Sequence, residues 1–268
     1  MRIETVTSAQ NPKIKNLLLL QEKSKARKEQ GLFVVEGRRE LEHCLEAGYT
    51  LRTIFYCPEI VGPTEFVENS RTSGVESAPT IIEIPEQLYR KVAYRESTEG
   101  IMAEVEYRSL SLKDLKLPEN PLVMVLESVE KPGNLGAVLR SADAAGVDAV
   151  IFCDPLTDLY NPNLIRASIG AVFTVPTVTA SSEETIAFLQ ERGIQILTAQ
   201  LQDSSLYYDI DMRRGTALVM GTEATGLTDL WRQAASAHIR IPMLGRLDSL
   251  NVSVSAAILL FEAVRQRQ

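Results

Sequence analysis

The feature that most constrains the fold is a series of short apolar segments in the second half of the chain, separated by helical stretches. Residues 122–126, Leu-Val-Met-Val-Leu, are apolar without alternation, which is typical of a strand buried on both faces. Further strands are expected at residues 149–153, 172–175, 194–198, 217–220 and 238–241. Strands that alternate with helices predict an α/β fold with a parallel sheet covered on both faces, which places ligands at the carboxyl ends of its strands.

The first part of the chain predicts a smaller α/β domain. A helix is expected over residues 11–30, because Pro12 suits a first helical position and Gly31 ends the pattern. Strands are expected at residues 32–35, 51–57, 81–84 and 100–107. The domains predicted are therefore residues 1–107, a linker over 108–121, and residues 122–268.

Composition excludes several classes of protein. With 45% hydrophobic residues the chain can bury a core, and no apolar run approaches the roughly 18 residues that span a bilayer. The first residues are not those of a secretory signal, so a cytoplasmic location and no membrane partner are expected. Three cysteines outside any C-x-x-C motif predict reduced, buried thiols. His43 and His238 lack ligand-spaced partners, so no metal site and no histidine-based triad is expected.

Charge is unevenly distributed along the chain. The net charge is −7, yet the first 39 residues hold nine basic against four acidic side chains. A basic end on an acidic body favours a local contact with phosphates, although a solvated helix face is the alternative. The candidate phosphate contacts of this region are Lys13, Lys15, Lys25, Arg27, Lys28, Arg38 and Arg39.

The segments that follow the predicted strands carry the candidate site residues. After residues 122–126, Asn134 is expected to cap a helix, and Arg140 on that helix is positioned to bind an anion or to form a surface ion pair. After residues 217–220, Gly221 and Gly226 indicate close backbone approach, but Leu227 replaces the lysine of a phosphate loop, which disfavours a nucleotide hydrolase.

The last of these segments follows residues 238–241. Ser249 and Asn251 are good helix-capping residues, and Asn251 lies nearest the apolar run that follows. From Val252 to Val264 the expected helix is apolar on nearly every side, which predicts burial in a core or in an oligomer interface.

Taken together, these segments resemble the SpoU/TrmH family of RNA methyltransferases, which belongs to the SPOUT class. The resemblance rests on residues 134–146 (NLGAVLRSADAAG), 218–227 (LVMGTEATGL) and 241–254, which contains SLNVSV, and residues 161–171 are also similar. Residues 1–107 resemble the family's substrate-binding domain, which is related in fold to ribosomal-protein RNA binders. Ala224 stands where the family often has glycine, and residues 246–248 are an individual version of a variable stretch.

The resemblance implies a trefoil knot in residues 122–268, a homodimer with composite active sites, and S-adenosylmethionine bound in the knot. The residues it implies for the cofactor are Thr198, Ala199, Gly221, Ile241 and Leu250. Those it implies for catalysis are Arg140, Asn134, Glu223, Ser249 and Asn251, and Arg166 joins the RNA contacts.

The function expected from this resemblance is 2′-O-ribose methylation of RNA, with 23S ribosomal RNA as the substrate. Ribose methylation of tRNA, methylation of a base nitrogen by a SPOUT relative and a non-catalytic RNA-binding module are the alternatives. We expect Arg140 to stay charged and to hold an RNA phosphate or the developing alkoxide, because a guanidinium is a poor base. Glu223 is expected to orient Asn134 or Asn251.

Overall fold

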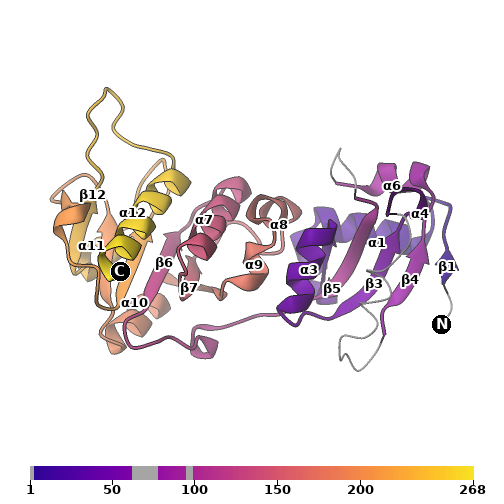
Figure 1. Cartoon of the computed structure of the whole chain (residues 1–268), viewed down its shortest axis with the longest axis horizontal. Helices are drawn as coiled ribbons and strands as arrows, with labels where there is room; N and C mark the ends of the chain where they lie inside the picture. The colour runs from indigo at the N-terminus through magenta and orange to yellow at the C-terminus, as the bar shows by residue number, and fades with distance from the viewer. Residues whose placement is uncertain (1–2, 62–77, 95–98) are drawn as a thin grey trace. The chain divides into compact units, whose positions relative to one another are not determined.

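The computed structural model describes residues 3–61, 78–94 and 99–268, and the chain divides into two units (Figure 1). The first unit consists of Met1–Arg108 and Leu159–Thr174, and the second of Ser109–Asp158 and Val175–Gln268. These limits differ from the expected domains at two segments, one of which is residues 109–121, expected as a linker but part of the second unit. Residues 159–174 are inserted in the sequence of the second unit but pack with the first.

The first unit is built on a mixed sheet with the strand order β1-β4-β3-β5-β2. β1, β4 and β3 run parallel, whereas β5 pairs antiparallel with β3 and β2. The strands are β1 (Glu4–Thr5), β2 (Leu32–Glu36), β3 (Leu51–Tyr56), β4 (Thr80–Glu83) and β5 (Ile101–Glu106). The helices described here are α1 (Pro12–Glu22), α2 (Ser24–Gln30), α3 (Arg38–Glu46), α4 (Pro58–Val61), α6 (Glu86–Val92), α8 (Pro162–Ser168) and α9 (Ala171–Thr174).

The single helix predicted over residues 11–30 is wrong at its middle, where two helices meet. The chain leaves helical conformation at Lys23, with φ −110° and ψ 110°. The buried guanidinium of Arg27 donates hydrogen bonds to the carbonyl oxygens of Leu20 (2.7 Å) and Gln21 (3.1 Å). These carbonyls lie in the last turn of α1, where helical partners are lacking, so Arg27 stabilises the break.

Aromatic packing joins residues 159–174 to the sheet of the first unit. The ring of Tyr160 stacks on Phe33 of β2 with the centroids 4.0 Å apart. The hydroxyl oxygens of Tyr160 and Tyr49 lie 3.1 Å apart, within hydrogen-bond distance. Burial of these rings fixes the inserted segment on the first unit.

The strand predicted at residues 172–175 is also wrong. These residues fall in the short helix α9 and its end, and Phe173 is buried against the same aromatic cluster, 5.9 Å from Phe33 between ring centroids. The strand follows instead at β8 (Thr177–Ala180). A short, mostly apolar run such as Val-Phe-Thr-Val does not distinguish a strand from a buried helical turn.

The second unit is built on a parallel sheet with the strand order β10-β12-β9-β11-β6-β7-β8. Its strands are β6 (Leu122–Glu127), β7 (Ala149–Cys153), β8, β9 (Gln195–Ala199), β10 (Ser205–Leu206), β11 (Thr216–Met220) and β12 (Ala237–Arg240). Its helices are α7 (Pro132–Ala144), α10 (Ser182–Glu191), α11 (Asp229–Ala234) and α12 (Val252–Arg267), with short 3₁₀ turns η1 (Leu112–Asp114) and η2 (Tyr207–Asp209).

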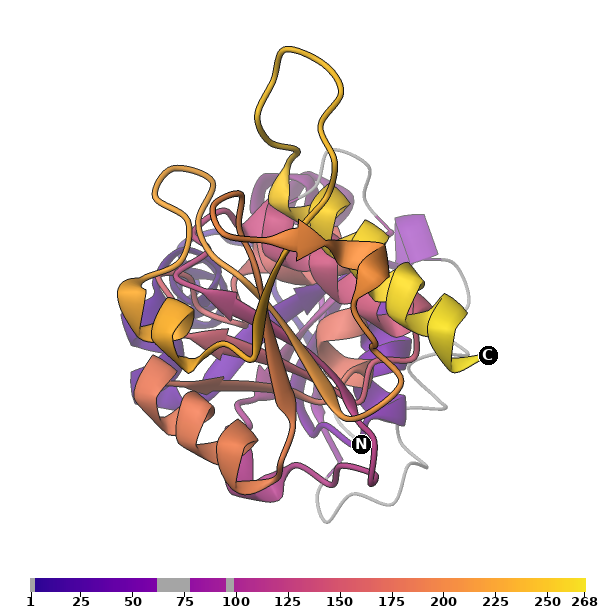
Figure 2. The same ribbon diagram turned by 90° about the vertical axis from the view of Figure 1, so that its left-hand side faces the viewer.

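Helices cover both faces of this sheet, as the apolar strands predict (Figure 2). β6 is buried along its whole length. Val123 and Val125 of β6 share a core with Leu189 of α10 and Trp231 of α11, whereas α7 and α12 pack against each other. The segment expected as a linker is packed as well, because Leu115 is buried in this core.

Candidate active site

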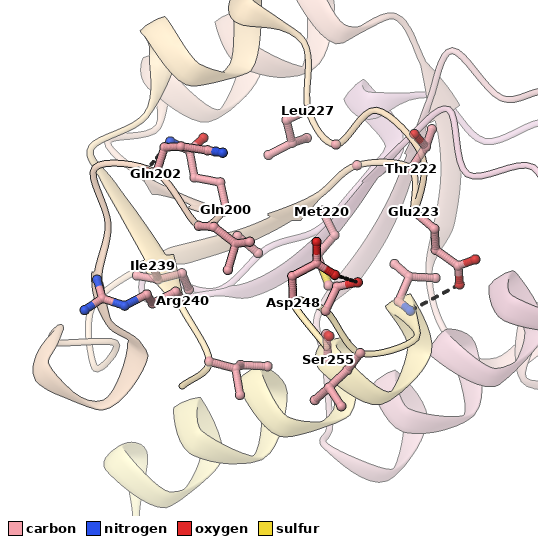
Figure 3. Close-up of a pocket in the computed structure, with 18 of the residues that line it drawn as sticks. Gln200, Gln202, Met220, Thr222, Glu223, Leu227, Ile239, Arg240, Asp248 and Ser255 are labelled. Atoms are coloured by element: carbon pink, nitrogen blue, oxygen red, sulfur yellow. Dashed lines mark hydrogen bonds between the residues drawn. The ribbon is translucent and has the colours of Figure 1, made fainter. Parts of the chain in front are cut away.

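A pocket of about 360 Å³ opens at the carboxyl ends of β9, β11 and β12, which are neighbours in the sheet (Figure 3). Ala199, Met220 and Arg240 end these strands and line the pocket. The loop after β11, the segment after β12 and the first turns of α12 complete the wall. A parallel sheet binds ligands at this edge, because its strand ends open there into loops.

The loop after β11 is held by its own backbone. Thr222 and Gly226 exchange two backbone hydrogen bonds of 3.2 and 3.0 Å. Gly221 lies so close that a Cβ there would meet the Gly226 carbonyl oxygen at 2.2 Å. The close approach that these glycines indicate is therefore made within the loop itself. At its far end the buried carboxylate of Glu127 accepts hydrogen bonds from the Thr228 amide (2.9 Å) and hydroxyl (2.6 Å).

Glu223, at the rim of the pocket, connects three segments that are distant in sequence. Its Oε1 accepts hydrogen bonds from the Nδ2 atoms of Asn134 (3.0 Å) and Asn251 (2.8 Å). Its Oε2 accepts one from Nζ of Lys131 (3.2 Å). Asn251 also donates to Oδ1 of Asn134 at 3.2 Å. The loop after β11, the start of α7 and the start of α12 thus meet in one polar cluster, which we call the Glu223 cluster.

The charge of Glu223 is maintained by its neighbours. The hydrogen bond from Lys131 and the backbone amide of Val252 lower the pKa of Glu223 below its ordinary value, and the positive charge of Lys131 acts in the same direction. At neutral pH Glu223 is therefore an ionised acceptor. A carboxylate that accepts from both asparagine amides is arranged to orient them.

The start of α12 agrees with the sequence prediction. Asn251 caps the helix, and its Oδ1 accepts hydrogen bonds from the Ser253 amide (3.0 Å) and hydroxyl (2.6 Å). Ser249 lines the pocket, and its hydroxyl donates a long hydrogen bond of 3.4 Å to Asp248. The predicted cap of α7 is wrong, because Lys131 occupies that position and Asn134 lies inside the helix, where its amide reaches Glu223.

Arg140 lies on the exposed face of α7, six residues after Asn134. No hydrogen bond or ion pair within the described ranges involves its guanidinium. An exposed guanidinium without an internal partner is available to bind an anion.

Four of the five residues expected to contact the cofactor line the pocket. They are Ala199, Gly221, Ile241 and Leu250. Thr198 does not, because its side chain is fully buried and its hydroxyl lies 2.6 Å from Nδ1 of His238. Of the catalytic candidates, Glu223 and Ser249 line the pocket, and the two asparagines join it through the Glu223 cluster.

Sequence reasoning missed Lys131 and Asp248. Lys131 lies in the loop after β6, where a lysine is typical of any solvated turn. Asp248 lines the pocket one residue before Ser249 but belongs to a stretch with no motif of its own. Adjacency to candidate residues is the signal that could have identified both.

The basic candidates of the first unit differ in accessibility. Arg27 is 2% exposed and donates to two backbone carbonyls, so its assignment as a phosphate contact is wrong. Three others form ion pairs with nearby carboxylates, namely Lys13 with Glu4, Lys25 with Glu29 and Arg38 with Glu42. The remaining candidates are exposed and have no ion pair with a described residue: Lys15, Lys28, Arg39 and Arg166.

The three cysteines are buried and unpaired with one another, as predicted. Within the described residues no cluster of three or more His, Cys, Asp or Glu side chains could hold a metal ion. In the same part of the chain, no helix has the length and apolar character needed to cross a membrane.

Comparison with known proteins identifies the family that this chain resembles. The model of the SpoU rRNA Methylase family matches residues 121–261, and that of the MRM3-like substrate binding domain matches residues 11–103. A 23S rRNA (guanosine-2′-O-)-methyltransferase, RlmB, of Bordetella pertussis is 38% identical over 208 residues, which cover 76% of this chain and 83% of the relative.

Solved structures agree along the whole chain. An RNA 2′-O ribose methyltransferase with 37% identity superposes with a TM-score of 0.84 over 98% of this chain and 99% of its own. An AdoMet-bound rRNA methyltransferase from Sinorhizobium meliloti, 31% identical, superposes with a TM-score of 0.89 over 99% of both chains. With a family match over more than half of its length and the Glu223 cluster formed by the three motif segments, this chain belongs to the SpoU rRNA methylase family.

Proposed function

We propose that this protein transfers the methyl group of S-adenosylmethionine to a ribose 2′-hydroxyl of 23S ribosomal RNA. The observation that carries the proposal is the Glu223 cluster, which joins the rim of the pocket to the helix that bears Arg140. The names of the relatives, which are 23S rRNA 2′-O-methyltransferases, support the choice of ribose and of ribosomal RNA. A cytoplasmic location accords with such a substrate.

The pocket fits this cofactor. Its volume lies in the range of about 300–1,000 Å³ that small-molecule sites occupy. Met220, Leu227 and Leu259 supply apolar walls, and the backbone of the loop after β11 supplies hydrogen-bonding groups. When bound, S-adenosylmethionine supplies an electrophilic methyl group on a sulfonium.

The chain's own residues then orient the acceptor and assist its deprotonation. Glu223 holds the amides of Asn134 and Asn251, and these asparagines fix the start of α7 relative to the pocket. Arg140 projects from the same helix and binds an RNA phosphate or the alkoxide that develops on the ribose. Its guanidinium remains charged, so the proton passes to the phosphate or to water. Alignment of the two reactants alone lowers the activation free energy by several kcal/mol.

Transfer of labelled methyl groups tests the proposal. The substrate is unmodified ribosomal RNA, and the label is located by nucleoside analysis. We expect label in a 2′-O-methyl nucleoside of 23S RNA, lost in Arg140→Ala and kept in Arg213→Ala, which removes a surface arginine paired with Asp211. Label in a base, or in tRNA alone, contradicts the proposal.

Charge-preserving Arg140→Lys separates two roles of Arg140. A lysine keeps the charge but lacks the planar fork of the guanidinium. We therefore expect turnover to fall at least tenfold. Near-normal turnover by this variant refutes bidentate binding by Arg140.

The first unit is proposed to bind RNA through exposed basic side chains. Contacts to phosphates position an RNA without specifying its sequence. We expect affinity for RNA to fall as salt rises, and the slope to decrease in Lys15→Ala or Arg39→Ala. A flat salt response rules out this surface.

We also propose a homodimer and a trefoil knot, as family membership implies. The outer face of α12 supports the dimer, because Val254 and Phe261 are 47% and 49% exposed on a helix whose other side buries Ala256, Leu259 and Leu260. Covering apolar side chains of this kind stabilises an interface. Sedimentation of the wild type and of Phe261→Glu tests it, with a dimer expected only for the wild type.

A further inference from the structure

Asp248 has a distinct place in the pocket. It precedes Ser249 in the segment after β12, it is exposed, and Figure 3 shows it among the residues that line the pocket. Its side chain accepts a hydrogen bond from the Ser249 hydroxyl at 3.4 Å. None of the roles assigned above involves Asp248.

The other charged side chains of the pocket are already engaged. Glu223 accepts from Lys131 at 3.2 Å. Arg232 pairs with Asp229, a residue outside the pocket, at 3.4 Å.

Arg240 is engaged in a similar way. Its guanidinium donates to the backbone carbonyl of Ser204 and points away from Asp248 (Figure 3). Asp248 itself has no ion pair with any side chain in the described ranges, so it contributes an uncompensated negative charge to the pocket.

We infer that Asp248 is a selectivity residue, which favours S-adenosylmethionine over the product S-adenosylhomocysteine through its charge. The inference rests on the proposed function. Methyl transfer breaks the bond from the methyl carbon to sulfur and forms one to the ribose oxygen. The electron pair of the broken bond stays on sulfur, which turns the sulfonium into a neutral thioether, and the hydroxyl proton leaves to phosphate or water. The ligand therefore loses one positive charge, and Asp248 loses its attraction for it.

The loss of positive charge from the ligand also has a kinetic consequence. Attraction to the sulfonium stabilises bound cofactor more than the transition state, in which the positive charge is already dispersed. Removing the charge of Asp248 should therefore raise the KM for S-adenosylmethionine without lowering kcat. It should also strengthen inhibition by the product relative to binding of the cofactor.

Calorimetric titration of the full chain with S-adenosylmethionine and with S-adenosylhomocysteine tests the inference. For Asp248→Asn we expect affinity for S-adenosylmethionine to fall about three- to tenfold, as a partly solvated charge interaction predicts, and affinity for S-adenosylhomocysteine to stay within about twofold. The difference should shrink at high salt. Asp203→Asn is the matched control, because Asp203 is exposed and lies outside the pocket, and asparagine tolerates its φ of 50°.

Three results overturn the inference. Equal weakening of both ligands assigns Asp248 to a group that both share, and unchanged affinities show that its charge has no effect. If the wild type binds neither ligand, the proposed cofactor and the inference are both refuted. If the wild type binds both ligands but Asp248→Asn shows one of the first two results, only the inference about Asp248 is refuted. Thermal unfolding of Asp248→Asn, and recovery of selectivity in Asp248→Glu, separate a charge effect from a folding defect.

Discussion

Gly221→Ala is the sharpest test of how the loop after β11 shapes the pocket. A Cβ at this position would lie 2.2 Å from the carbonyl oxygen of Gly226 and 2.6 Å from the amide nitrogen of Leu227. Both distances are well below 3.0 Å, the shortest separation at which Cβ atoms are found from other heavy atoms. Both contacts are to backbone atoms, which cannot rotate away as a side chain can. The loop must therefore open.

The magnitude follows from the cost of overpacking. Adding a methyl group to a filled site costs about 1–3 kcal/mol, and about 1.4 kcal/mol is a tenfold change in affinity. Because the pocket wall and Glu223 belong to the same loop, we expect S-adenosylmethionine to bind Gly221→Ala at least tenfold more weakly. Calorimetric titration measures this directly.

Gly245→Ala provides the matched control. Nothing lies within 4 Å of the Cβ that it would add, although Gly245 belongs to a segment that borders the same pocket. We expect its affinity for the cofactor to equal that of the wild type. If Gly221→Ala also binds normally and melts at the wild-type temperature, the tight loop described above is not what shapes the pocket.

Three further predictions concern charge and burial. Lys131→Gln should raise the pKa of Glu223 toward its ordinary value, because the variant removes a neighbouring positive charge. Glu223 would then be protonated at a higher pH, so the acid limb of the pH–rate profile should move to higher pH. An acid limb that does not move would show that turnover does not depend on the ionisation of Glu223. Arg27→Ala should lower the free energy of unfolding by about 1–3 kcal/mol in denaturant titration, because it removes the donor to two buried carbonyl oxygens. The control variant Lys28→Ala should change the free energy of unfolding by less than about 0.5 kcal/mol. Equal effects of the two variants would contradict a buried structural role for Arg27. Burial raises the pKa of all three cysteine thiols, so at pH 8 a thiol reagent should label the native protein slowly and the unfolded protein fully, and rapid native labelling would show that a thiol is accessible.

Much of the second unit could be predicted because its signals are local. The apolar run of β6 is buried as its composition predicts, and the cap at Asn251 depends only on its immediate neighbours. A parallel sheet also brings the ends of neighbouring strands to one edge, so the segments after β9, β11 and β12 had to meet. Those predictions needed no knowledge of packing.

The predictions that failed depended on contacts between distant residues. Residues 172–174 are helical in α9, where Phe173 packs on the aromatic cluster of the first unit, and that cluster cannot be recognised from these few residues alone. Arg27 has the composition of a phosphate contact, yet its guanidinium turns inward to two carbonyls at a helix break. Charge and periodicity do not reveal the direction of a long side chain.

By itself, the sequence determined the α/β class, the basic first segment and the three motifs that identify the family. Hydrophobic periodicity, capping chemistry and motif spacing are properties of neighbouring residues. Only the tertiary structure decided that Glu223 holds Asn134 and Asn251 together and that Lys131 maintains its charge. The same holds for Asp248, which has no cation partner among the residues that the structure describes, a property that emerges only when the pocket is assembled. Hydrogen bonds and charges act over a few ångströms, so residues a hundred positions apart acquire these roles only when folding brings them together.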